Sequence, residues 1–165
     1  MEGVYSGTAV GIVRWGHEPS GEFMRGLLWL RYPSSPVKLA SAEQEGVDAA
    51  RNKLVQWFLR TDYLSLFLLD ADVVVHPETL VRLKSWGQLV VSASCIPGLD
   101  LAVVLNPRPV DALMRVDRVG MRCTLVDREA LISVSQPWFE QGKPFGPGYV
   151  DRSVIVAYLT EVKGE

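Results

Sequence analysis

The chain has 165 residues, 48% hydrophobic and 22% charged, which predicts a single compact domain over residues 1–165 with material for a core. Its 17 lysines and arginines against 19 aspartates and glutamates give a net charge of −2, which argues against a general nucleic-acid binder. Two widely spaced cysteines argue against a disulfide scaffold and a zinc site. With no signal peptide and no apolar run of about 20 residues, we expect a cytoplasmic protein without a transmembrane segment.

Apolar runs and helical periodicities alternate along the first two thirds of the chain. This alternation favours an α/β fold of Rossmann-like type, with a mostly parallel sheet and helices on both faces. The expected elements are, in chain order, a strand at 8–13, a helix at 19–30, a strand at 37–42, helices at 46–60 and from 77 to 87 on either side of a strand at 63–69, strands at 89–93, 101–105 and 121–126, a short helix from 127 or 128 to about 134, a loop at 136–148, and a final helix from 151 to 159.

The segment Asp70-Ala71-Asp72 closes the apolar run of residues 63–69 (YLSLFLL). Side chains alternate along a strand, but a bend just beyond its end would turn both carboxylates toward one cation. Carboxylate oxygens suit Mg²⁺, which keeps positions open for substrate phosphates. Ligands of open α/β sheets bind beyond the carboxyl ends of the strands, where this pair is expected. The alternative is that the two aspartates cap a helix or hold a turn.

Several motifs follow one another in a fixed order. Ala50-Arg51-Asn52 opens the run ARNKLVQWFLRTDYLSLFLLDADVVVHPETLVRL, which is followed by VDRVGMRCTLVDREAL and then PWFE. Together with TAVGIVRWG near the start, this series resembles the nucleotide-sugar glycosyltransferases of the GT-A fold, especially family-2-like enzymes. The resemblance covers most of the chain in order, and it lies in the series of motifs rather than in any single one.

The resemblance implies a metal-dependent transfer of a hexose from a nucleoside-diphosphate sugar to an acceptor hydroxyl. Asp70 and Asp72 would hold Mn²⁺ or Mg²⁺, with Asp72 making the firmer contact, and the ion would neutralise the departing diphosphate. Arg51 would bind the diphosphate or the donor sugar, or instead form a salt bridge that orients the two acids. Asp151 would deprotonate the acceptor hydroxyl in an inverting reaction, or else cap the final helix.

Three further residues are candidates for contacts with the donor. Trp15, in the loop after the first strand, would stack on the nucleotide base or else pack at the rim of the domain. Gly120 would allow close approach of the backbone to the donor sugar, or form a plain turn. Trp138 would provide an apolar platform for a sugar ring, or anchor its loop to the core.

The chain departs from the pattern of this family at its end. Val150 stands where relatives carry a glutamate before Asp151, no histidine follows Asp151, and the chain ends soon afterwards. The resemblance therefore implies a shortened form that lacks most of the acceptor side. The donor would be a nucleoside-diphosphate sugar and the acceptor a glycan, lipid or protein, with a second copy of the chain or another partner as a candidate source of the missing surface.

Three other functions compete with this interpretation. A nucleotide-sugar binding domain without catalysis would explain the departures near Asp151. A phosphatase of the haloacid-dehalogenase type would use Asp70 as nucleophile and Asp72 as general acid, but the later acidic pair of that family is missing. A nucleotidyltransferase would need a glycine-rich basic loop, of which GIVRWGHEPSG is a poor version.

Overall fold

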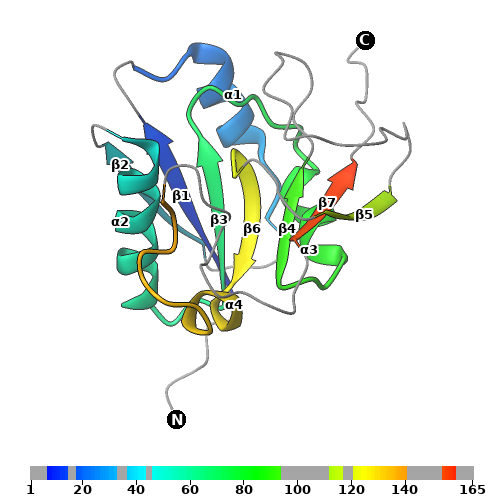
Figure 1. Cartoon of the computed structure of the whole chain (residues 1–165). Helices are drawn as coiled ribbons and strands as arrows, with labels where there is room; N and C mark the ends of the chain where they lie inside the picture. Colours follow the sequence, from blue (N-terminus) through cyan, green and yellow to red (C-terminus); the bar gives the residue numbers. More distant parts are fainter. Residues whose placement is uncertain are drawn as a thin grey trace.

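The computed structural model describes residues 7–14, 18–32, 37–43, 46–93, 112–116, 121–140 and 154–158, which form one seven-stranded sheet with helices packed against it (Figure 1). The strand order is β2-β1-β3-β6-β4-β7-β5. The elements are β1 (Thr8–Arg14), α1 (Gly21–Trp29), β2 (Val37–Glu43), α2 (Val47–Leu59), β3 (Ser65–Asp70), α3 (Thr79–Ser85), β4 (Val90–Ala93), β5 (Ala112–Val116), β6 (Cys123–Asp127), α4 (Arg128–Ile132) and β7 (Val154–Tyr158).

The sheet is mixed, which corrects the expectation of a mostly parallel sheet. Strand β1 pairs in parallel with β2 and β3, and β4 pairs in parallel with β7. Strand β6 runs antiparallel to both β3 and β4, and β5 runs antiparallel to β7. A parallel neighbour needs a crossover of a dozen or more residues, usually a helix. The alternation of strands and helices that predicts such crossovers covers only the first two thirds of the chain, and β5 and β6, which pair antiparallel with their neighbours, come after that part.

Helices cover both faces of the sheet, as the sequence predicts. Along β1, Ala9 and Val13 pack with α2 and α4, whereas Val10 and Ile12 pack with α1 and α3. This alternation is the period of two that a strand buried on both faces requires. Gly11 lies on the α2 face, where an added Cβ would come within 3.2 Å of Leu54, so α2 packs unusually close to the sheet at this point.

The end of the chain differs from the prediction of a helix from 151 to 159. Residues Val154–Tyr158 form β7, which pairs with β4 on one side and β5 on the other. The sequence VIVAY is rich in β-branched and aromatic residues, and the free sheet edge at β4 gives it a partner. The strand Ala112–Val116 was also not anticipated. The predicted strand at 101–105 lies outside the described residues.

Arg128 ties α4 to the turn that leads into β3. Its guanidinium donates hydrogen bonds to the carbonyl oxygens of Phe58, Leu59, Thr61 and Tyr63, and it lies 4.7 Å from the centroid of the Phe58 ring. The last carbonyls of a helix lack partners within the helix. Arg128 therefore caps α2 and holds the entry to β3, the strand that carries the aspartate pair.

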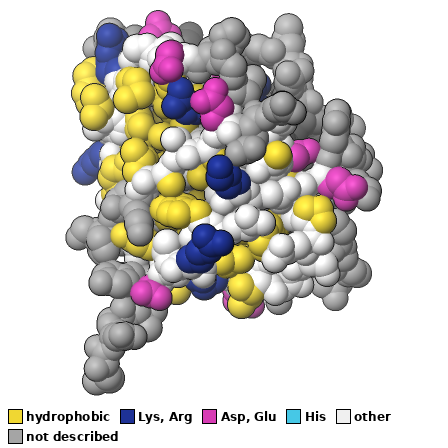
Figure 2. Space-filling view, turned by 90° about the vertical axis from the view of Figure 1, so that its left-hand side faces the viewer, with side chains coloured by type: hydrophobic (Ala, Val, Ile, Leu, Met, Phe, Trp, Pro, Cys, Tyr) yellow, Lys and Arg dark blue, Asp and Glu magenta, His cyan; other side chains and the backbone are white. Residues whose placement is uncertain are grey.

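The surface of the described residues carries charges of both signs. Figure 2 shows lysine, arginine, aspartate and glutamate side chains interspersed with hydrophobic ones on the face nearest α2 and β2. Two large hydrophobic side chains at the end of α1, Leu28 and Trp29, are 79% and 64% exposed. Among the described residues, no helix has the length and apolar character needed to cross a membrane.

Candidate functional site

The aspartate pair lies at the point where the chain changes direction across the sheet. Strand β1 lies between β2 and β3, so the connection from β2 through α2 crosses back over β1. The carboxyl ends of these three strands share the upper edge in Figure 1, and Asp70 is the last residue of β3. Such a switch point is where open α/β sheets bind ligands. The predicted position of Asp70 and Asp72 at this edge is confirmed.

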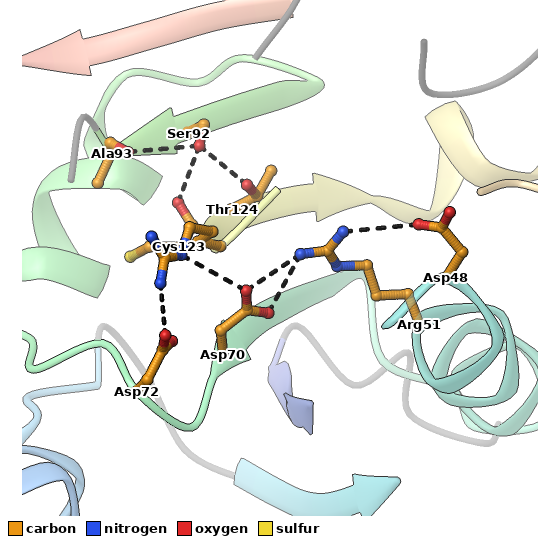
Figure 3. A network of polar contacts seen from close by, with 9 residues as sticks. Asp48, Arg51, Asp70, Asp72, Ser92, Ala93, Cys123 and Thr124 are labelled. Atoms are coloured by element: carbon orange, nitrogen blue, oxygen red, sulfur yellow. Dashed lines mark hydrogen bonds and ion pairs between the residues drawn. The ribbon is translucent and has the colours of Figure 1, made fainter. Parts of the chain in front are cut away.

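The period of two along β3 turns Asp70 toward α2. Leu66 and Leu68 pack on the α2 face, and Asp70 continues that row to the end of the strand. There the guanidinium of Arg51 donates from Nη2 to both carboxylate oxygens of Asp70, at 3.2 and 3.1 Å (Figure 3). Arg51 Nη1 also lies 3.7 Å from the carboxylate of Asp48, one turn earlier on α2. Of the two roles considered for Arg51, the structure shows the salt bridge that orients Asp70.

A tight turn follows Asp70 and presents Asp72 at the surface. The amide of Val73 donates to the carbonyl oxygen of Asp70, and the amide of Ala71 donates to that of Val13 at the end of β1. On the other side, Gly26 of α1 packs against Val75, where a Cβ would come within 3.3 Å of the Val75 carbonyl oxygen. The turn is thus held by β1 and α1. The side chain of Asp72 is 48% exposed, whereas Asp70 is 2% exposed.

Arg122 is the site residue that the sequence analysis missed. It precedes β6, and its carbonyl oxygen accepts a hydrogen bond from the amide of Asp70. Its Nη2 lies 2.5 Å from Asp72 Oδ2, and its Nε lies 3.8 Å from Asp70 Oδ2. The bend after β3 does bring both carboxylates to one cation, and in this structure that cation is the guanidinium of Arg122. The local sequence shows only a single arginine before an apolar run. Its position beside Asp70 could not be predicted from that, because it depends on the antiparallel pairing of β6 with β3.

Burial dominates the electrostatics of Asp70. The pKa of Asp70 is raised from its ordinary value of 3.8 to about 6, because loss of solvent, with a smaller contribution from the charge of Asp72, outweighs the opposing effect of Arg51 and Arg122. A carboxyl group that is nearly inaccessible and forms two bonds to one arginine has no free oxygen directed to solvent. Asp72 is therefore the carboxylate of the pair that a ligand can approach.

The first and last motifs of the series meet beside this network. Asn52 on α2 donates from Nδ2 to the carbonyl oxygen of Phe139 at 2.8 Å, and its Oδ1 accepts from the Phe139 amide at 3.0 Å. The guanidinium of Arg51 lies 5.9 Å from the centroid of the Phe139 ring. Neighbouring residues of the Ala-Arg-Asn segment therefore have different partners. Arg51 binds Asp70, and Asn52 binds the Pro-Trp-Phe segment.

The other predicted site residues fall into two groups. Trp138 is 3% exposed and donates from Nε1 to the Leu131 carbonyl oxygen at 2.9 Å, so its geometry matches the anchoring role rather than the sugar platform. Trp15, Gly120 and Asp151 lie outside the described residues, and their assigned roles stay predictions.

The aspartate pair fits a divalent cation only in part. Within the described ranges, no group of three or more His, Cys, Asp or Glu side chains is placed to hold a metal ion. Asp72 would offer one accessible carboxylate, with the remaining ligands coming from substrate phosphates and water, as is common for Mg²⁺. Asp70 would act mainly by fixing the turn, unless Arg51 were displaced from its carboxylate.

Comparisons with known proteins concern the fold alone. No family model matches the chain, and a search of curated proteins found no match. Among solved structures, the chain is similar to the crystal structure of A197 from STIV, with a TM-score of 0.62 and 18% sequence identity over 93% of this chain and 81% of that one. This similarity supports the α/β architecture, and it assigns neither an activity nor a site.

Proposed function

We propose that this protein is a GT-A-like glycosyltransferase, which moves a hexose from a nucleoside-diphosphate sugar to an acceptor hydroxyl with inversion and with the help of Mn²⁺ or Mg²⁺. One observation carries the proposal. Asp70 and Asp72 lie with Arg51 and Arg122 at the switch point of an α/β sheet, where anionic nucleotides bind in such folds. The order of sequence motifs supports the same function independently.

The residues of the site have separable roles in this proposal. Asp72 offers a carboxylate to a cation bound together with the donor, and that cation would neutralise charge on the departing diphosphate. Asp70, held by Arg51, keeps the turn in place so that Asp72 faces outward. Asp151 remains the proposed base for the acceptor hydroxyl, and the acceptor would be a glycan, lipid or protein.

The geometry disfavours the phosphatase alternative. A nucleophilic Asp70 would need an oxygen that reaches substrate, but its carboxylate is 2% exposed and both its oxygens accept from Arg51. A binding domain without catalysis is the second candidate, because Val150 replaces the expected glutamate next to Asp151. That candidate predicts the same ligand and no turnover.

The first experiment is a thermal-shift screen of nucleoside diphosphates and their sugars, each with and without Mn²⁺. We expect one base to raise the melting temperature in a Mn²⁺-dependent manner, because a ligand that binds only the folded state stabilises it. Release of nucleoside diphosphate from the matching sugar nucleotide then separates the transferase from the binding domain. Absence of any shift across the whole panel would contradict both.

The variant Asp72→Asn tests the metal assignment. It removes the accessible carboxylate and should abolish Mn²⁺-dependent stabilisation by the nucleotide while leaving the ligand-free melting temperature nearly unchanged. Asp62→Asn is the matched control, because Asp62 is also an exposed aspartate but lies before β3, at the opposite end of that strand. Equal nucleotide and Mn²⁺ responses in the two variants would refute the role of Asp72.

A further inference from the structure

Arg122 places a positive charge at the position where a bound metal ion would have to act. Its guanidinium pairs with Asp72 Oδ2 at 2.5 Å and approaches Asp70 Oδ2 at 3.8 Å, so it lies between the two carboxylates. The side chain is 30% exposed, and the pair is therefore accessible from solvent. A cation that takes Asp72 must share this carboxylate with Arg122 or displace it.

The two arginines of the network differ in their freedom to move. Arg51 is 11% exposed and is held by Asp70, by Asp48 and by the neighbouring Phe139 ring. The short-range partner of Arg122 is Asp72, an exposed group in a turn. Exposed ion pairs contribute little to stability, so Arg122 can change partner at a small cost in free energy.

We propose that Arg122 is an exchangeable diphosphate-binding residue, which occupies Asp72 in the absence of ligand and transfers to the donor's phosphates when a divalent cation takes Asp72. A guanidinium forms paired, charge-assisted hydrogen bonds to phosphate as readily as to carboxylate. Each charged group keeps an oppositely charged partner in this exchange. The carboxylate of Asp72 replaces its arginine partner with the metal ion, and Arg122 replaces its carboxylate partner with phosphate. This inference rests on the proposed function and adds to it a residue and a binding order.

The proposal predicts effects of opposite sign on two ligands. Arg122→Met removes the competitor for Asp72 and keeps the backbone bond from the Asp70 amide, so Mn²⁺ alone should bind about threefold more tightly, as expected for loss of an exposed pair. The same variant removes a charged phosphate contact, so nucleoside diphosphate in the presence of Mn²⁺ should bind about tenfold more weakly. If the role of Arg122 were purely structural, Arg122→Met would weaken the binding of both ligands or of neither.

The experiment measures Mn²⁺ binding by electron paramagnetic resonance and binding of ADP, CDP, GDP, UDP and dTDP by calorimetry at saturating Mn²⁺. Arg60→Met is the control, since Arg60 is an exposed arginine at the far end of α2 and its loss changes the net charge equally. The inference would be overturned if Arg122→Met changed the affinities for Mn²⁺ and for nucleoside diphosphate in the same direction, or if both affinities equalled those of Arg60→Met. Either result would leave the glycosyltransferase proposal in place. If the wild-type protein binds none of the five nucleotides, both proposals fail.

Discussion

The pair formed by Asn52 and Phe139 offers a sharp test of how the site is assembled. The two residues are 87 positions apart in the sequence, and their two hydrogen bonds, at 2.8 and 3.0 Å, join α2 to the Pro-Trp-Phe segment. Asn52→Ala removes both of these bonds, one from the amide and one from the carbonyl of Phe139. Phe139 is itself buried, so water replaces these bonds poorly.

The expected loss of stability follows from these contacts. Two neutral hydrogen bonds are worth about 1 kcal/mol each, and the loss of a bond from a buried polar group adds to the cost, so Asn52→Ala should lower the free energy of unfolding by about 3 kcal/mol. For a chain of this size the melting temperature should fall by roughly 6–12 °C. Urea titration of the ligand-free protein gives the first quantity, and calorimetry gives the second.

Two further variants make the reasoning refutable. Lys53→Ala changes the next, exposed residue of the same helix and should be nearly neutral. Asn52→Asp keeps the acceptor for the Phe139 amide but sets a carboxylate oxygen against the Phe139 carbonyl, so it should be at least as destabilising as alanine. If the free energies of unfolding of Asn52→Ala and Lys53→Ala agree within about 0.5 kcal/mol, the Asn52–Phe139 pair does not hold the segment, and the link between the two motifs is wrong.

Three other predictions follow from the described contacts. Arg128→Met should lower the free energy of unfolding in urea by about 3 kcal/mol and Arg128→Lys by about 2 kcal/mol, because an ammonium group cannot reach all the carbonyl oxygens that the guanidinium contacts. An unchanged free energy of unfolding in Arg128→Met would contradict the capping role. Because burial raises the pKa of Asp70 from 3.8 to about 6, its contribution to the free energy of unfolding is complete well below pH 3.8 and is lost as the pH rises through 6, so the wild type should lose about 3 kcal/mol relative to Asp70→Asn between pH 3 and pH 7; parallel pH profiles would refute this. Gly87 has a φ of 62°, so Gly87→Ala should cost about 1 kcal/mol by calorimetry, whereas Gly21→Ala, also with open space around it, should not.

Local patterns predicted most elements on which the site is built. The apolar runs predicted the positions of β1 and β3, and apolar residues at three-to-four-residue spacing predicted those of α1 and α2. The apolar run before Asp70 predicted that the aspartate pair lies at the end of a strand. These predictions succeeded because burial on one face or on both imposes a period on the residues of a single element. Fold class was predicted in the same way, as an α/β arrangement with helices on both faces.

The partners of the aspartates were decided only by the tertiary structure. Arg122 meets Asp70 and Asp72 because β6 inserts antiparallel beside β3, and Asn52 meets Phe139 because the chain returns to α2 after α4. The strand β7 likewise formed where an isolated segment suggested a helix, since β4 and β5 supply its hydrogen-bonding partners. Periodicity is a property of neighbouring residues, whereas strand order and direction depend on which distant segments bury one another. The sequence by itself therefore determined that two carboxylates end a buried strand, and the tertiary structure decided which cations surround them.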